Sequence, residues 1–380
     1  MKTTLTVVAA LLVAMTSCMK DEIVDHNKGN EMTFRASVDK ALARSGDANV
    51  TNLAKLQSFK VTATIDGQAN YFTDMLVEKA SAGSWNTSAT YYWPSYALGF
   101  YAYTPTDISG VSINKEGKKI SAFTPDKSID RQVDLLVAYN TGNRTDNELS
   151  GVNLNFKHAL SQIDVMAKCS NPHIEIVVKA VSIVNAKTKG DFTFPAAVTS
   201  TSNNLNGCWN PGAEAAGPAD YKASFSSGHE VTLTEMAASI NPSTNNFMLI
   251  PQQLTKWEKS VTAGAYIAVL CRISSKDGDT KTQLYPELAP DGGNAGKFGS
   301  IIVPVDTNWE AGKKYIYTLN FCGDGGGAGQ VDPNPDTTDP NVDPNPKPGS
   351  NGGDPVLGNP IKFTVTVEDW VDAPAQNLDL

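Results

Sequence analysis

The sequence predicts an all-β fold, because three observations agree. Apolar and polar residues alternate in short stretches such as 59–65 and 361–367, and a period of two is typical of a half-buried strand. Turn dipeptides such as Asp66-Gly67 separate these stretches, since glycine tolerates the positive φ of a tight hairpin. Helical 3.6-residue periodicity is scarce along the chain. Many short strands at this spacing predict β-sandwiches, and their number predicts two in tandem.

Length and charge limit the classes of function. The chain has 380 residues, of which 41% are hydrophobic and 19% charged, which is enough for about two packed domains of ~150 residues each. Its formal net charge is −9. An acidic chain does not favour nucleic acid as a partner, because binding phosphates requires a basic face.

The N-terminus predicts secretion. Lys2 precedes an apolar run over residues 5–15, which ends in small residues and Cys18. This is the layout of a signal peptide, and the run is shorter than the roughly 20 residues of a membrane span. It resembles a bacterial lipoprotein signal, which implies removal of residues 1–17 and acylation of Cys18. The alternative is an ordinary cleaved signal peptide with an unrelated cysteine.

A short polar stretch follows the signal. Lys20, Asp21 and Glu22 look like the acidic tag that sends lipoproteins of some Gram-negative anaerobes to the outer face of the outer membrane. Residues 18–30 are then a tether between lipid and fold. No later apolar run is long enough to span a bilayer, so the lipid is the expected membrane attachment, and one anchor leaves the folded part in water.

The strand-like stretches fall into two groups. We expect an N-terminal sandwich over residues 31–168, beginning with a strand at 32–38, and a C-terminal sandwich over residues 169–322. The boundary is placed at Ser170-Asn171-Pro172, a strong turn signal. Cys169, Cys208, Cys271 and Cys322 have no CxxC spacing. They fit either disulfides of an oxidising compartment or single buried thiols, and we favour buried thiols.

Residues 323–357 have a different composition. The stretch is glycine-rich and then repeats aspartate, proline and asparagine, so it predicts an extended, mobile linker with little to bury. Residues 358–380 contain one more strand, whose alternating apolar side chains are Ile361, Phe363, Val365 and Val367.

Catalytic and cofactor motifs are lacking, so we expect neither an enzyme nor a cofactor. The four histidines stand in no HExxH pattern, and there is no GxSxG elbow. His158 is interpreted as structural. Asp332, Asn334 and Asp336 have the opening spacing of a calcium loop, but Thr337 replaces the required glycine, and no metal is expected.

Two further patterns concern sugars. Asp336-Thr337-Thr338 resembles an O-glycosylation motif of some Gram-negative anaerobes, which makes Thr337 a candidate site. Trp85, Tyr91, Tyr92 and Trp93 form an aromatic group that fits either a sugar-stacking surface or sandwich core, and we favour core.

Several motifs together resemble one family. They are Phe34-Arg35-Ala36, Tyr92-Trp93-Pro94, Phe100-Tyr101-Ala102-Tyr103-Thr104-Pro105, Asp134-Leu135-Leu136-Val137-Ala138, Phe156-Lys157-His158-Ala159-Leu160-Ser161-Gln162-Ile163, Leu249-Ile250-Pro251-Gln252, Trp309-Glu310-Ala311-Gly312-Lys313 and Val365-Thr366-Val367-Glu368-Asp369-Trp370. This pattern resembles the fimbrillin (Mfa-like) family of type V pilus subunits, over nearly the whole mature chain. The long stretch 323–358 departs from it.

The resemblance implies two transthyretin-like Greek-key β-sandwiches and a lipoprotein precursor of a cell-surface pilus that supports adhesion. It implies that a protease cuts after an arginine and removes the first strand, for which Arg44-Ser45 is the expected site, and that the last strand of another pilin subunit fills the vacated groove. Arg35 also fits the protease, but it lies inside the expected strand. Other pilin subunits and host or bacterial surface ligands are the implied partners. The alternative is a surface glycan- or ligand-binding lipoprotein on the same fold.

Overall fold

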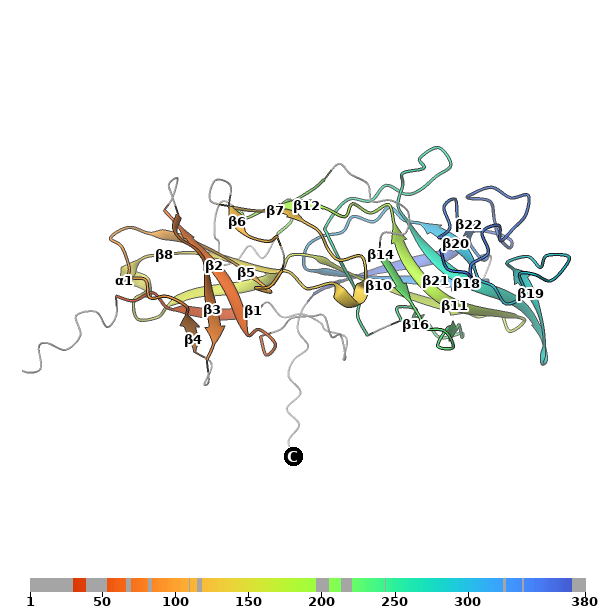
Figure 1. Ribbon diagram of the computed structural model, residues 1–380, viewed down its shortest axis with the longest axis horizontal. Coiled ribbons are helices and arrows are strands. Elements are labelled where there is room, and N and C mark those ends of the chain that lie inside the picture. The colour runs from red at the N-terminus through yellow and green to blue at the C-terminus, as the bar shows by residue number, and fades with distance from the viewer. Residues whose placement is uncertain are drawn as a thin grey trace, which may run out of the picture.

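The computed structural model describes residues 30–38, 53–65, 70–80, 84–108, 110–114, 118–195, 205–212, 221–242, 244–323, 326–336 and 338–370. These residues form an elongated molecule, with the strands of residues 34–104 toward one end and those of residues 266–304 toward the other (Figure 1). The prediction of an all-β chain is confirmed. In the described part, helix is limited to one turn, α1 (Arg144–Asn147), and one 3-10 turn, η2 (Ile129–Arg131).

The first half of the chain builds a seven-stranded sheet. Its strand order is β1-β9-β8-β5-β2-β3-β4. The bounds are β1 (Phe34–Val38), β2 (Ser58–Thr64), β3 (Asn70–Lys79), β4 (Trp85–Thr87), β5 (Leu98–Thr104), β8 (Leu136–Gly142) and β9 (Val152–His158). All neighbours pair antiparallel except β1 and β9, which are parallel.

The central strands of this sheet are buried on both faces. In β5, Phe100 and Ala102 enter one core, whereas Tyr101 and Tyr103 enter another. The apolar run of β5 does not alternate, and a run of this kind predicts burial on both sides. The second core is covered by a small sheet in the order β13-β12-β7-β6. The bounds are β6 (Ile113–Asn114), β7 (Lys119–Phe123), β12 (Gly190–Thr193) and β13 (Trp209–Pro211).

The second half forms a sandwich of two sheets around its own core. One sheet contains β10 (Ser161–Cys169), β16 (Ala238–Ser239), β17 (Phe247–Leu249), β21 (Lys313–Phe321) and β23 (Lys362–Asp369). The facing sheet contains β11 (Ile174–Val184), β14 (Tyr221–Ser224), β15 (Val231–Thr232), β18 (Tyr266–Asp277), β19 (Thr280–Tyr285), β20 (Gly299–Pro304) and β22 (Gln330–Val331). Alternate residues of β10, β11, β18 and β21 interdigitate between the two sheets.

The strand pairing does not follow the boundary expected at 168/169. β10 pairs in parallel with β21 over its whole length, so it already belongs to the second sandwich. The turn at Ser170-Asn171-Pro172 connects the two sheets of that sandwich rather than two domains. In addition, β12 follows β11 in the chain but pairs with β7 over the first sheet. The division into two separate tandem sandwiches is therefore not confirmed, and the transthyretin-like topology stays a prediction.

The stretch expected to be an exposed linker is largely packed. Residues 326–336 and 338–358, here called the covering segment, extend the sheet that contains β18 through β22, and Val342 packs on the outer face of that sheet. Val331, Val342 and Val356 are buried, and β22 pairs with β20. The sequence holds a signal for this cover, since Tyr266 to Cys271 is an apolar run without alternation and such a strand needs both faces buried.

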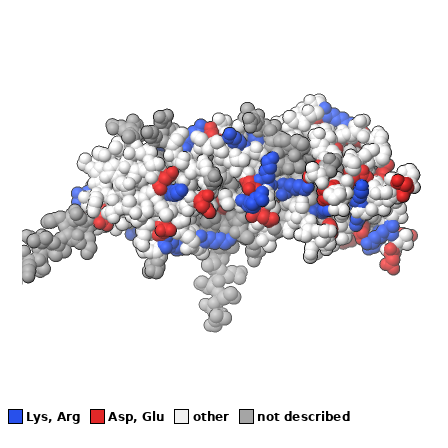
Figure 2. All heavy atoms as spheres, in the orientation of Figure 1, with Lys and Arg blue, Asp and Glu red and all other residues white. Residues whose placement is uncertain are grey.

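Charged side chains are distributed rather than gathered. On the face shown in Figure 2, lysines and arginines are interspersed with aspartates and glutamates, and the end formed by the first sheet carries few of either. Among the residues described here, no helix is long and apolar enough to cross a lipid bilayer.

The packed covering segment makes a testable prediction about hydrogen exchange. The amides of Ala328, Val331 and Val356 donate to Leu357, Asp354 and Gly329, so we expect them to exchange slowly in native protein, at rates set by opening of the second sandwich. The exposed turn residue Gly349 serves as a fast reference. Exchange of all four amides at the unprotected rate would restore the mobile-linker interpretation.

Candidate functional site

The first strand lies at the edge of the first sheet. Phe34 and Met32 are 4% and 3% exposed, and the ring of Phe34 packs edge-on against Phe59 and Phe100 at centroid distances of 6.3 and 5.7 Å. The parallel ladder pairs Phe34 with Val152 and Val38 with Phe156. β1 is thus bonded to the sheet on one side and fills an apolar groove with its alternate side chains.

Residues just before β1 close the sheet on itself. The amide of Met32 donates to the carbonyl oxygen of Tyr91 at 2.8 Å, and the amide of Trp93 donates to Asn30 at 2.9 Å. Tyr91 and Trp93 follow β4, the strand at the far end of the same sheet. Loss of residues 30–38 would therefore leave unpaired backbone groups at two places and expose the rings of Phe59 and Phe100, both costly in water.

The last strand is also at an edge, and its apolar face is only partly covered. β23 pairs antiparallel with β21 of its own chain, from Lys362 opposite Asn320 to Asp369 opposite Lys313. Ile361 is buried and Phe363 and Val365 are half-buried, but Val367 is 52% exposed. β23 therefore has the alternating pattern of a core strand, but its apolar side chains are only partly buried in its own chain.

A buried cluster anchors the end of β23. Trp370 is 3% exposed, and its ring stacks on the imidazole of His158 at 4.0 Å with a 10° interplanar angle. The Nδ1 atom of His158 lies 2.9 Å from a carboxylate oxygen of Asp134, and both side chains are buried. His158 is thus structural, and Trp370 ties the last strand to the junction between β9 and β10.

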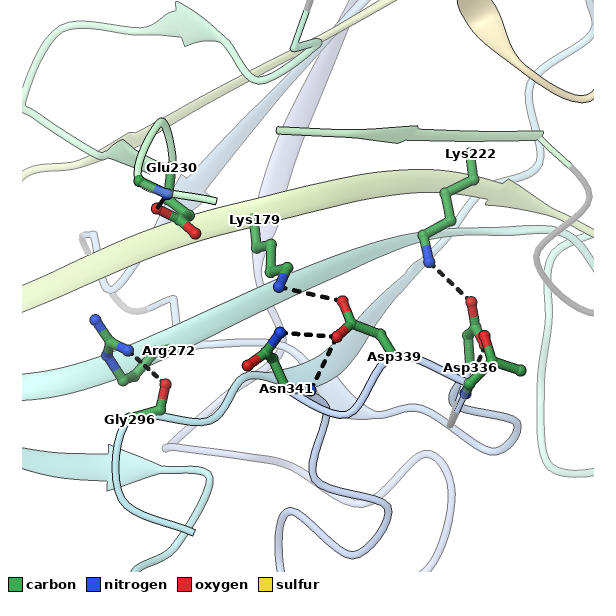
Figure 3. A network of polar contacts seen from close by, with 10 residues as sticks. Lys179, Lys222, Glu230, Arg272, Gly296, Asp336, Asp339 and Asn341 are labelled. Atoms are coloured by element: carbon green, nitrogen blue, oxygen red, sulfur yellow. Dashed lines mark hydrogen bonds and ion pairs between the residues drawn. The ribbon is translucent and has the colours of Figure 1, made fainter. Parts of the chain in front are cut away.

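Ion pairs hold the covering segment on the sheet. Figure 3 shows Lys179 of β11 and Lys222 of β14 directed at Asp339 and Asp336, with Nζ–Oδ2 distances of 3.1 and 2.8 Å. The hydrogen bond from Lys222, together with that from Thr338, lowers the pKa of Asp336 to about 2. Both pairs are partly exposed, and pairs of this kind contribute at most about 1 kcal/mol each.

The aspartates of this segment also shape its backbone. Asp332, Asp339 and Asp343 each accept a hydrogen bond from the amide two residues later, at 2.9 Å in each case. Such side-chain turns satisfy backbone donors without a ladder. Asp332 is itself buried, where the hydroxyl of Ser300 donates to it at 2.6 Å, and burial raises the pKa of its carboxyl group. Sequence reasoning interpreted this repeat as an extended linker and missed these turns.

The packed segment leaves little free chain before β23. The amide of Ala328 donates to Leu357 and that of Gly327 to Pro360. A Cβ atom on Gly327 would lie 1.6 Å from the carbonyl oxygen of Asn359, so the two stretches are in direct contact. The expected 35-residue free arm is therefore absent from the described chain, and residues up to 360 are bound to their own sandwich.

Several expected sites lie outside the described residues. They are the lipidation site Cys18, the export tag Lys20, Asp21 and Glu22, the processing site Arg44-Ser45 and the glycosylation candidate Thr337. Arg35 lies inside β1, as expected. In the aromatic group, Trp93 is buried and Trp85 and Tyr91 pack on the same core, whereas Tyr92 is 42% exposed. The group is therefore mainly core.

Two observations concern chemistry. In the part of the chain that the structure describes, no three His, Cys, Asp or Glu side chains are grouped so that they could hold a metal ion.

A polar cleft of about 310 Å³ opens between β13 and the loops at residues 250–253 and 308–310. It is lined by Lys187, Leu205, Asn206, Gly207, Trp209, Pro211, Pro251, Gln252, Gln253, Asn308, Trp309 and Glu310. The sequence did not indicate this cleft, because its residues come from four separate stretches of the chain.

A comparison with models of protein families assigns this chain to a family. The model described as fimbrillin-like matches residues 26–339. The chain belongs to the fimbrillin-like family. None of the curated protein sequences compared with it matches.

Several solved structures are similar to this chain. A fimbrial protein from Bacteroides vulgatus is similar, with a TM-score of 0.53 and 12% sequence identity over 90% of this chain and 100% of the other. A proposed cell adhesion protein from Parabacteroides distasonis gives a TM-score of 0.47 and 12% identity over 91% and 99% of the two chains. One from Bacteroides ovatus gives 0.43 and 15% over 90% and 99%. At such low identity, the first likeness supports the fold alone.

The anchor of this fimbrillin-like chain can be tested by mutation. Trp370→Ala removes a buried ring stacked on His158, so we expect a loss of about 3–5 kcal/mol in the free energy of unfolding, measured by urea denaturation. Val367→Ala in the same strand is the control, with an expected change within about 0.5 kcal/mol. Equal effects of the two substitutions would show that Trp370 is not the anchor.

Proposed function

We propose that this chain is a structural subunit of a cell-surface pilus that assembles by exchange of edge strands and supports adhesion. The observation that carries the proposal is the position of β1. It fills an apolar groove at the sheet edge, and the expected processing site at Arg44-Ser45 comes six residues after it in the sequence. Family membership supports the same role.

Strand exchange has a physical driving force in this chain. Removal of residues 1–44 vacates the positions of Met32, Phe34, Ala36 and Val38. The last strand of a neighbouring subunit carries Ile361, Phe363, Val365 and Val367 at the same spacing. Complete burial of an aliphatic or aromatic side chain stabilises by roughly 1.5–3 kcal/mol, and Val367 has the most to gain because it is the most exposed of the four in its own chain. The strand addition also restores ladder hydrogen bonds.

The donor strand must first leave its own chain. It is held by the ladder to β21, by an ion pair between Lys313 and Asp369, and by Trp370. The ladder is regained on the neighbour, so the net driving force comes from filling the emptied groove. Because proteolysis is irreversible, cleavage after Arg44 makes this exchange one-directional.

The N-terminal features fit the same proposal. Cys18 would carry the lipid, Lys20, Asp21 and Glu22 would direct export to the outer face of the outer membrane, and Thr337 would be a glycosylation site on the exterior. An anchor subunit would keep the lipid and stay uncut at Arg44, whereas a shaft or tip subunit would lose it.

A ligand-binding lipoprotein is the second candidate. The observation in its favour is the cleft beside β13, because its volume of about 310 Å³ falls at the lower end of small-molecule sites. Its amide side chains and the two indoles, Trp209 and Trp309, are groups that recognise sugars, although both indoles are largely buried.

Assembly is tested with protein treated with an arginine-specific protease. We expect wild type to form SDS-resistant polymers, and Val365→Asp or deletion of residues 359–380 to abolish them, because a charge or a missing strand cannot fill the groove. Thr364→Asp, on the exposed side of β23, is the control and should polymerise. Thermal unfolding of each variant checks that the subunit itself folds.

Two outcomes contradict this mechanism. Polymers that form as readily without residues 359–380 as with them would exclude β23 as the donor. Treated wild-type protein that never polymerises would favour an anchor subunit or the ligand-binding function.

Processing is tested by N-terminal sequencing of protein extracted from the cell surface. A shaft or tip subunit is expected to begin at Ser45, since the exchange requires loss of β1. An N-terminus blocked by acylated Cys18 would identify an anchor. A start inside residues 34–38 would show that the protease reaches Arg35 and that β1 is not protected in the precursor.

A further inference from the structure

Two cysteines far apart in the sequence meet at one end of the second sandwich. Cys169 is the last residue of β10, and Cys322 follows directly after β21. The parallel ladder pairs Cys169 with Phe321, so Cys322 is one residue further along the neighbouring strand. Neighbouring strands lie about 4.8 Å apart and rise about 3.3 Å per residue, which places such diagonal Cα atoms about 6 Å apart.

The backbone of Cys322 turns its side chain toward Cys169. In a regular strand, residues 321 and 322 would point to opposite faces. Cys322 instead has a φ of 52°, in the left-handed region, and its side chain packs against the same core that contains Cys169 and Phe321. The two thiols lie close enough for each to shift the pKa of the other.

This contact changes the acidity of the pair. The hydrogen bond from Cys322 lowers the pKa of Cys169 to about 7, and the same hydrogen bond, with burial, raises the pKa of Cys322. One thiolate is therefore available near neutral pH, and it is the thiolate that reacts with disulfides.

We propose that Cys169 and Cys322 are a modification site that forms an intramolecular disulfide on contact with a small-molecule or protein disulfide. The diagonal placement fits the Cα separation of 4.4–6.8 Å that disulfides require. Cys322 is the more exposed of the two thiols, so the oxidant reaches the pair from its side.

The exchange balances as follows. The thiolate of the pair attacks one sulfur of the oxidant R–S–S–R, forms a mixed disulfide and releases R–S⁻. The remaining cysteine loses its proton, attacks the protein sulfur of the mixed disulfide and releases the second R–S⁻. The two thiolates released take up the two protons that the cysteines have lost. Two cysteine thiols are oxidised, and one disulfide is reduced to two R–SH molecules.

The bond would hold the second sandwich together. It joins β10 to the end of β21, the two central strands of one sheet, and encloses the chain from β11 to β21 in one covalent loop. It also fixes the point from which the covering segment starts. A disulfide that closes a long loop stabilises mainly by restricting the unfolded chain.

The other cysteines provide controls. Cys208 is partly buried and packs against the core between the first sheet and β12, away from the pair. Cys271 is fully buried in β18, on the facing sheet, and burial raises the pKa of its thiol.

The experiment equilibrates the full chain with oxidised or reduced glutathione, alkylates free thiols and maps the peptides without reduction. We expect a linked pair that contains Cys169 and Cys322 in the oxidised sample. The melting temperature of that sample should exceed that of the reduced one by roughly 5–15 °C. The difference should vanish in Cys322→Ser and persist in Cys208→Ser.

Two results of the peptide mapping would overturn the proposal. One is alkylation of both Cys169 and Cys322 after equilibration with oxidised glutathione. The other is a linked peptide in which Cys271 replaces either of them. A melting temperature that depends on redox state equally in Cys322→Ser and wild type would show that another pair carries the effect.

Discussion

Unpaired backbone at the edges of its sheets is the constraint on which this structure depends. Each exposed edge presents a row of N–H and C=O groups that must find water or a partner. The first sheet meets this constraint by bending until residues 30–32 reach Tyr91 and Trp93. β1 is therefore held from two directions, and the groove it fills exists because the sheet curls around Phe34. A strand in that position can be replaced only by another strand of the same pattern.

The second sandwich meets the constraint in two different ways. One sheet is bordered by the covering segment: Val342 packs on its outer face, whereas Val331 and Val356 pack into the core between the two sheets. Two lysine–aspartate pairs and a series of aspartate turns hold this segment in place. The other sheet ends in β23, which pairs on one side and leaves Val367 exposed. The apolar side chains of the covering segment are thus buried, whereas those of the last strand are only partly buried. Under the proposed assembly, this asymmetry favours β23 rather than β22 as the donor strand.

Trp370 connects these features. Its stacking on His158 links the last strand to the β9–β10 junction, where the first sheet gives way to the second sandwich. The packed covering segment and the anchored tryptophan leave β23 with little freedom on either side. In the proposed assembly, release of β23 from its own subunit is a local opening of one edge that withdraws Ile361, Phe363 and Val365 from the core of the second sandwich.

The sequence by itself determined the strands, because period-two alternation and turn residues act between near neighbours. Residues 32–38 and 361–367 were recognisable as strands from that pattern alone, and the family was recognisable from short motifs such as Phe156 to Ile163. The tertiary structure decided which faces are covered and by what. β10 joined β21, β12 crossed back to the first sheet, and the repeat at 332–346 folded onto β18 and β20. These outcomes depend on contacts between residues about 30 to 150 positions apart. A local pattern shows that a run such as Tyr266 to Cys271 must be buried on both faces, but the covering partner is selected by shape and charge across the fold.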